Sequence, residues 1–327
     1  MEKAYPKQVN YLRSVVISGT INHAYCFIGT DQGGQNHLLE YLCQEAACTD
    51  NDGASCGQCD SCTEAHRDLH ADILTIQGEI NEPIGIELAH AVHRHLASRP
   101  VLAPKRIALI KNAHHMTAQA ANALLKIVEE PPKCAVILMS TSLPDMLPAT
   151  LLSRMQAVRV PRMPHTAVKQ LFSEVSAYSQ QQQETYTHLA DGRFERVLQL
   201  SDPEGEEKEW WHDQLQLWIT FLLSSTAKRD ALIQKEFMTG KQSKEKVHTL
   251  PQVLGLLEII LRDTILHNSG FEGMKMIQLQ GKSLEQLQKK YSVDNSRHAL
   301  SQLTDLKRMC AHNVNKKMIF DYLITRI

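Results

Sequence analysis

The chain has 327 residues, of which 43% are hydrophobic and 22% are charged, and its formal net charge is −1. This composition excludes a disordered or fibrous protein and is typical of a globular chain with two or three domains. A nearly neutral charge also argues against a protein that coats nucleic acid through electrostatics alone. No stretch approaches the ~20 apolar residues of a membrane span, and no signal peptide opens the sequence, so we expect a cytoplasmic protein.

Alternating strands and helices predict an α/β domain over residues 1–162. A helix is expected at 8–18, and a strand at 25–29 leads through a glycine-rich turn into a helix over 37–48. Short apolar strands and amphipathic helices then alternate, at 72–77, 86–98, 106–110, 117–130, 135–140 and 157–160. This alternation is typical of a five-stranded parallel sheet that carries helices on both faces.

Helical patterns alone follow Pro161 and Pro164. Residues 163–203 are expected to form a small helical domain, and the charged segment 202–209 is expected to be a linker. Long helical patterns then follow one another, so residues 210–327 are predicted to form an all-α domain.

The turn YCFIGTDQGGQN (25–36) has the spacing of a phosphate-binding loop. Gly29 and Gly34 match the glycines in the pattern of Gly, four residues, Gly, Lys and Ser or Thr. Gln35 replaces the lysine that meets the phosphates, and Asn36 replaces the hydroxyl that holds magnesium. The residues therefore indicate either a degenerate P-loop or a chance glycine-rich turn.

A second part of a nucleotide site is absent after the strand at 106–110. A nucleotide hydrolase built on such a sheet ends this strand in acids that hold magnesium and orient water. Here the strand is followed by Lys111, Asn112, Ala113 and His114. We therefore expect that the chain uses no ATP as a cofactor and has no ATPase activity.

Four of the eight cysteines lie close together, at Cys48, Cys56, Cys59 and Cys62. Four thiolates at this spacing can surround one tetrahedral zinc ion in a closed, structural site. Three cysteines with His66, an iron–sulfur cluster and free thiols are the alternatives. The other cysteines, Cys26, Cys43, Cys134 and Cys310, are expected to be buried thiols.

A short helix is expected at 147–156, and Ser153 and Arg154 lie near its end. An arginine at such a place is either a solvated side chain or an arginine finger. A finger is a permanently charged, planar group that reaches the γ-phosphate in a neighbouring subunit.

Several segments together resemble one family. They are HAYCFIGTDQGGQNHLL (23–39), the four-cysteine insertion, MTAQAANALLKIVEEPP (116–132), LPATLLSRMQ (147–156) and HNVNKKMIFDYLITRI (312–327). In these segments the protein resembles the delta-prime subunits of the bacterial DNA polymerase III clamp loader, members of the AAA+ clamp-loader family, and the resemblance extends over nearly the whole chain.

The resemblance implies an α/β AAA+ domain with a zinc module at 48–62, a helical lid, and an all-α C-terminal collar. It also implies a non-catalytic stator that binds the tau/gamma and delta subunits through the collar and the AAA+ interfaces. Such a subunit helps the loader to assemble the sliding clamp on primer-template DNA. It is part of a DNA-directed DNA polymerase III holoenzyme without itself being a polymerase or an ATPase.

The same resemblance assigns Arg154, with Ser153, to the family's Ser-Arg-Cys arginine finger, which acts in trans on a neighbouring ATPase subunit. Met155 stands where the family has cysteine. Arg196, after GRFE, lies near the family's sensor-2 region. Two other functions remain open at this point: an active AAA+ ATPase with a divergent nucleotide site, and a stand-alone zinc-containing DNA-binding protein.

Overall fold

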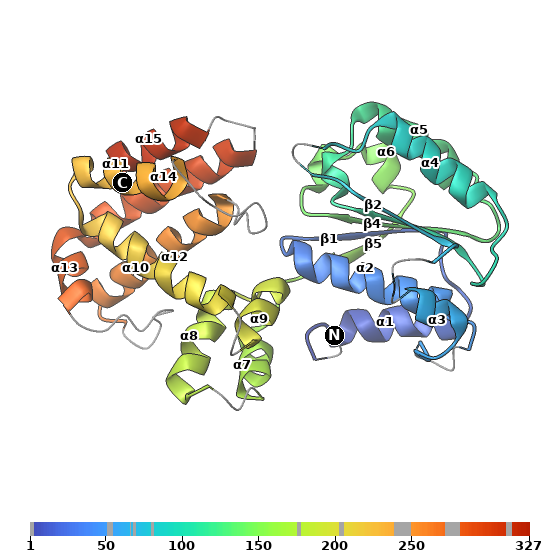
Figure 1. Ribbon diagram of the computed structural model, residues 1–327, viewed down its shortest axis with the longest axis horizontal. Coiled ribbons are helices and arrows are strands. Elements are labelled where there is room, and N and C mark those ends of the chain that lie inside the picture. The colour runs from blue at the N-terminus through green and yellow to red at the C-terminus, as the bar shows by residue number, and fades with distance from the viewer. Residues whose placement is uncertain are drawn as a thin grey trace. The chain divides into compact units, whose positions relative to one another are not determined.

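The computed structural model describes residues 3–50, 55–65, 67, 70–79, 82–174, 178–202, 206–238, 250–271, 282–311 and 316–327 (Figure 1). Contacts divide the chain into two compact units. The first comprises Met1–Leu171 and Ala190–Leu198, and the second comprises Phe172–Leu189 and Gln199–Ile327. The finer division predicted at 1–162, 163–203 and 210–327 stays a prediction.

A five-stranded parallel sheet forms the centre of the first unit. Its strands lie in the order β2-β3-β4-β1-β5 and pair in parallel throughout. All seven residues of β4 are buried, as expected for a strand of a parallel sheet that is covered on both faces. The strands are β1 (Ala24–Gly29), β2 (Ile73–Gln77), β3 (Arg106–Lys111), β4 (Ala135–Thr141) and β5 (Gln156–Val160).

Helices cover both faces of this sheet (Figure 1). One face carries α1 (Pro6–Ile17) and α2 (Gln32–Ala47), and the other carries α4 (Ile86–Ala97) and α5 (Ala118–Glu129). Thr117 begins α5 as an N-cap, since its side chain accepts a hydrogen bond from the Ala120 N–H. Shorter helical elements are α3 (Asp60–Ala65), η1 (Ala113–His115), η2 (Pro144–Met146) and α6 (Ala149–Leu152).

Helices alone make up the described part of the second unit. Two helices, α7 (His165–Ser173) and α9 (Phe194–Ser201), have residues in both units, and α8 (Gln180–Ala190) has its last residue, Ala190, in the first unit. The others are α10 (Glu206–Leu223), α11 (Thr226–Ile233), a π-helical turn η3 (Gln234–Met238), α12 (Leu250–Asn268), α13 (Lys282–Lys290), α14 (Val293–Ala311) and α15 (Lys316–Arg326). None of the helices in the described ranges is long and apolar enough to cross a membrane.

The linker predicted at 202–209 is wrong in its second half, because α10 already begins at Glu206. α10 carries the buried side chains of Trp211 and Trp218. Burial of this apolar face stabilises the helix, which therefore extends into the acidic segment before the two tryptophans. α11 was not identified as a separate helix from the sequence.

Arg229 of α11 connects the ends of several helices in the second unit. It is buried, and its guanidinium donates hydrogen bonds to the carbonyl oxygens of Phe221 and Leu222 and to the Tyr291 hydroxyl. The Tyr291 hydroxyl in turn donates to the carbonyl oxygen of Ile327. Because helices end with unpaired carbonyl groups, one planar arginine can satisfy several of them at once.

Candidate functional site

The glycine-rich turn between β1 and α2 is filled by its own glutamine. Gln35 is fully buried, and its Nε2 donates a hydrogen bond to the Gly29 carbonyl oxygen over 2.6 Å. A Cβ atom on Gly29 would lie 2.1 Å from the Val160 carbonyl oxygen, and one on Gly34 would lie 2.1 Å from the Tyr5 hydroxyl. The Val160 backbone therefore requires glycine at position 29 whether or not a phosphate binds, and a side chain at position 34 would displace the Tyr5 hydroxyl.

Asp31 ties two distant segments to this turn. Its carboxylate is buried and accepts hydrogen bonds from the Tyr5 hydroxyl, at 3.1 Å, and from the Phe194 N–H, at 2.7 Å. Burial, together with the Asp31 charge, raises the pKa of Tyr5. The His37 and Phe194 rings pack edge to face, with centroids 4.8 Å apart. The turn is thus closed by the N-terminal segment and by the start of α9.

The carboxyl ends of the strands are joined by a chain of neutral polar groups. The Ser140 hydroxyl donates to Asn36 Oδ1 over 2.6 Å and accepts from the Asn112 N–H. Asn112 adopts the left-handed conformation, with φ at 56°, and its Nδ2 donates to the Gly78 carbonyl oxygen. Asn36, which stands where a magnesium-binding hydroxyl was expected, therefore contacts protein groups instead.

Lys111 stands at the end of β3, where a nucleotide hydrolase would carry an acid. Its Nζ lies 2.5 Å from Glu40 Oε1 on α2, so the two charges form an ion pair. A lysine ammonium group cannot act as a magnesium ligand, because Mg²⁺ binds carboxylate oxygens.

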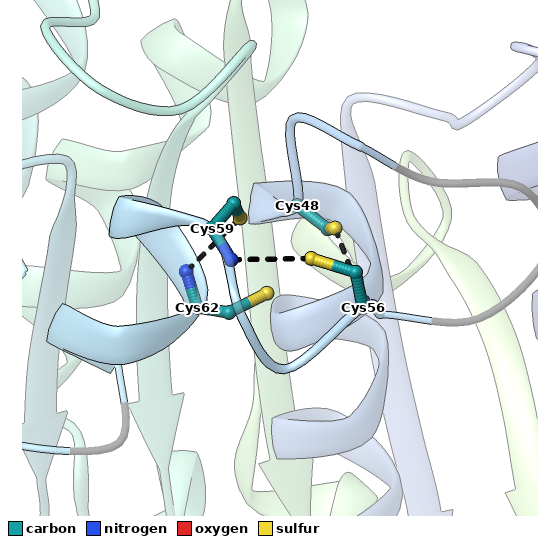
Figure 2. A group of neighbouring side chains, drawn as sticks. All are labelled: Cys48, Cys56, Cys59 and Cys62. Atoms are coloured by element: carbon teal, nitrogen blue, oxygen red, sulfur yellow. Dashed lines mark hydrogen bonds between the residues drawn. The ribbon is translucent and has the colours of Figure 1, made fainter.

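The four cysteines of the predicted metal site come together between the end of α2 and α3 (Figure 2). Their sulfur atoms all lie within 4.8 Å of one another. Tetrahedral zinc with sulfur bonds of ~2.3 Å separates its ligands by roughly 3.8 Å, so the arrangement can close around one ion. The Cys56 and Cys59 N–H groups donate to Cys48 Sγ and Cys56 Sγ, and such bonds favour thiolates.

The thiols of this cluster differ in their ease of ionisation. Hydrogen bonds from Thr49 and from the Cys62 N–H lower the pKa of Cys59 to about 5. Burial raises the pKa of Cys62 to about 12. Since metals bind thiolates, a bound cation would have to stabilise the ionised form that burial disfavours at Cys62. The donor set fits a soft metal ion held in a closed site.

A buried serine and a buried histidine connect the cysteine cluster to the sheet through hydrogen bonds. Ser61 Oγ donates to the Ala47 carbonyl oxygen at the end of α2, over 2.6 Å, and lies 2.8 Å from His70 Nε2. The Asp72 N–H donates to His70 Nδ1 just before β2. These contacts could not be predicted from the sequence, because the residues that make them are neither evenly spaced nor part of a motif.

Of the alternative ligands and other cysteines, His66 and the side chain of Cys310 lie outside the described residues. Cys26 and Cys43 are buried as predicted, but the prediction for Cys134 is wrong, since it is exposed. Cys134 lies in the turn between α5 and β4, where the chain runs over the surface before β4 enters the core.

Arg154 lies on the surface immediately after α6. Its Nε is 2.8 Å from Glu129 Oε1, its Nη1 donates to the Thr150 carbonyl oxygen over 2.8 Å, and its side chain is 40% exposed. Ser153 is also exposed, and its Oγ donates a hydrogen bond to the same Thr150 carbonyl oxygen. Met155 is 7% exposed and belongs to the hydrophobic core, which anchors the end of this turn.

Arg196 lies on α9 and is buried. Burial is the main reason that its pKa falls to about 10. Its predicted nearness to the family's sensor-2 region stays a prediction.

Comparison with known proteins points to one family. Residues 4–164 match the family described as "DNA polymerase III, delta subunit". The delta' subunit of Bacillus subtilis is 23% identical over 338 aligned residues, which cover 99% of this chain and 96% of that protein. The chain belongs to the DNA polymerase III clamp-loader family.

Two other similar proteins agree with this assignment. The tau subunit of Escherichia coli is 28% identical over 190 residues, which are 56% of this chain but only 29% of the tau subunit. A DNA polymerase III gamma subunit-related protein from Thermotoga maritima has the same fold, with a TM-score of 0.54, 19% identity and 97% of both chains covered. The clamp-loader AAA+ sheet predicted from the sequence is thereby confirmed.

Cys59→Ser is expected to abolish metal binding by the cysteine cluster, because one of four candidate ligands is lost. Elemental analysis of the purified protein should find about one ion per chain before the substitution and almost none after it. We expect chelation to lower the unfolding temperature by roughly 5 °C or more, since the ion stabilises only the folded state. Cys134→Ser is the control and should keep its metal; equal metal content in the two variants would contradict a four-cysteine site.

Proposed function

We propose that this chain is the non-catalytic stator subunit of a bacterial clamp loader, which helps ATP-driven assembly of the sliding clamp on primed DNA. The observation that carries the proposal is the Gln35 amide bound to the Gly29 carbonyl inside the turn that would otherwise receive phosphates. The Asp31 carboxylate in the same turn adds a negative group that would repel a phosphate. The full-length likeness to a delta' subunit supports the same role.

A chain with this turn is expected to bind no ATP even when its lysine is restored. Gln35→Lys leaves Asp31 in the turn and Lys111 in place of the acid, so magnesium and the phosphates still lack their partners. Equilibrium binding with Mg-ATP should give a dissociation constant above ~1 mM for this variant, against a micromolar value for the motor subunit. Micromolar binding by Gln35→Lys would mean that the lysine alone was missing, and would favour the alternative function of an ATPase with a divergent site.

The active contribution of this subunit is proposed to be Arg154, presented in trans to ATP held by the adjacent motor subunit. Its exposed, permanently charged guanidinium suits this role, because charge develops on the γ-phosphoryl group in the transition state. Ser153 supports the finger by capping the Thr150 carbonyl of the short helix.

Arg154→Ala should lower the DNA-stimulated ATPase rate of the reconstituted loader by ~10-fold or more, because the transition-state charge loses a donor. Gel filtration should show that the complex still assembles, since the Arg154 side chain is exposed and its removal does not disturb the hydrophobic core. The control is Arg159→Ala, which removes another exposed arginine on β5. An ATPase rate equal to that of the control would exclude the finger.

The cysteine cluster is proposed to hold zinc as a structural ion, since four sulfur ligands leave no open position for catalysis. The helices of residues 210–327 are proposed to be the collar through which tau/gamma and delta bind. The sliding clamp and primer-template DNA would be contacted through the complex, in the cytoplasm where replication takes place.

The stator role is tested most directly by assembly. Tagged full-length chain, mixed with tau/gamma and delta, should recover both partners in a five-subunit complex that survives gel filtration. DNA binding should depend on that complex. Tight DNA binding by the chain alone, without recovery of either partner, would instead support the stand-alone zinc-containing DNA-binding protein.

A further inference from the structure

The arginine after α6 is held in a defined direction by an acid from another helix. Glu129, the last residue of α5, lies 25 residues before Arg154 and takes its Nε at 2.8 Å, while the Thr150 carbonyl takes Nη1. A guanidinium carries five N–H donors in one plane. The two contacts fix that plane and leave the remaining donors free to meet an anion.

The place of Glu129 on its helix makes this contact informative. Helix C-terminal ends carry partial negative charge, so a carboxylate there is unfavourable and a basic residue is preferred. Glu129 is also 47% exposed and contributes little to the core. Helix stability and packing therefore give no reason for an acid at this position, whereas the ion pair with Arg154 does.

We propose that Glu129 is a positioning residue for Arg154, one that orients the finger before it meets the phosphate in the adjacent subunit. This inference rests on the proposed function of Arg154. A long, solvated arginine samples many rotamers, and holding it in one of them reduces the ordering that must occur at the moment of reaction.

The strength of the pair suits such a role. Both side chains are partly exposed, and exposed ion pairs are weak, so the contact biases the arginine without locking it. A phosphoryl group carries more charge than one carboxylate and can be approached by the donors that Glu129 leaves unused. Glu129 therefore need not be displaced for the finger to act.

The test measures DNA-stimulated ATP hydrolysis by the complete loader containing Glu129→Ala. We expect kcat to fall about 2- to 5-fold with an unchanged KM for ATP and unchanged assembly, because only orientation is lost. Glu129→Gln keeps an oxygen that can accept from Arg154 and should recover part of the rate. Glu130→Ala removes the neighbouring exposed acid and should leave the rate unchanged.

A double-mutant cycle separates positioning from a general structural effect. Glu129→Ala should have no further effect in a loader that already carries Arg154→Ala, because the residue acts only through that arginine. If the losses in ATPase rate from the two substitutions multiply in the double variant, the positioning role is wrong. The same holds if Glu129→Ala has the wild-type ATPase rate while Arg154→Ala is slow, and either result leaves the finger role intact. A wild-type rate for Arg154→Ala would overturn the finger, and this inference with it.

Discussion

The hydrogen bond from the Gln35 amide to the Gly29 carbonyl is the contact on which the surroundings of the β1–α2 turn depend. A phosphate loop normally leaves its backbone N–H groups open toward an anion. Here a neutral side chain enters the same space and is buried there. A buried amide must find partners, and the carbonyl of the turn provides one. The protein's own side chain thus stabilises this strand-to-helix connection from within.

Asp31 extends this closure to the rest of the first unit. Its partners, Tyr5 and Phe194, lie 26 and 163 residues away in the sequence, so one carboxylate joins the beginning of the chain to the start of α9. In an ATPase of this fold a nucleotide can supply or withdraw such contacts as it binds and leaves. In this chain the contacts are hydrogen bonds between the protein's own groups, so the turn is closed without a nucleotide.

The sheet could be predicted from the sequence because its central strands are continuous apolar runs, of which 135–140 is the clearest, and because each is followed by a helical pattern. The gathering of the four cysteines could also be predicted, since their spacing alone limits what the thiols can surround. The filling of the turn could not. The motif identifies Gln35 as a missing lysine, but the direction of its side chain depends on the backbone and on Asp31, whose partners are remote. Glu129 was equally hidden, because an acid at an exposed helix end is ordinarily solvated.

Arg154 shows how one short segment can combine a fixed base with a movable end. Met155, next to it, is buried in the core, so the backbone at this point is anchored by hydrophobic contacts. Arg154 itself is held only by a partly exposed ion pair and one carbonyl, which water and other anions can compete for. A rigid base limits where the guanidinium can reach, and a weak hold lets its plane adjust while the Glu129 contact is kept. An arginine that acts on a phosphate in another subunit needs both properties, since an error in its position lowers the rate of reaction and a small adjustment brings its remaining donors to the phosphate.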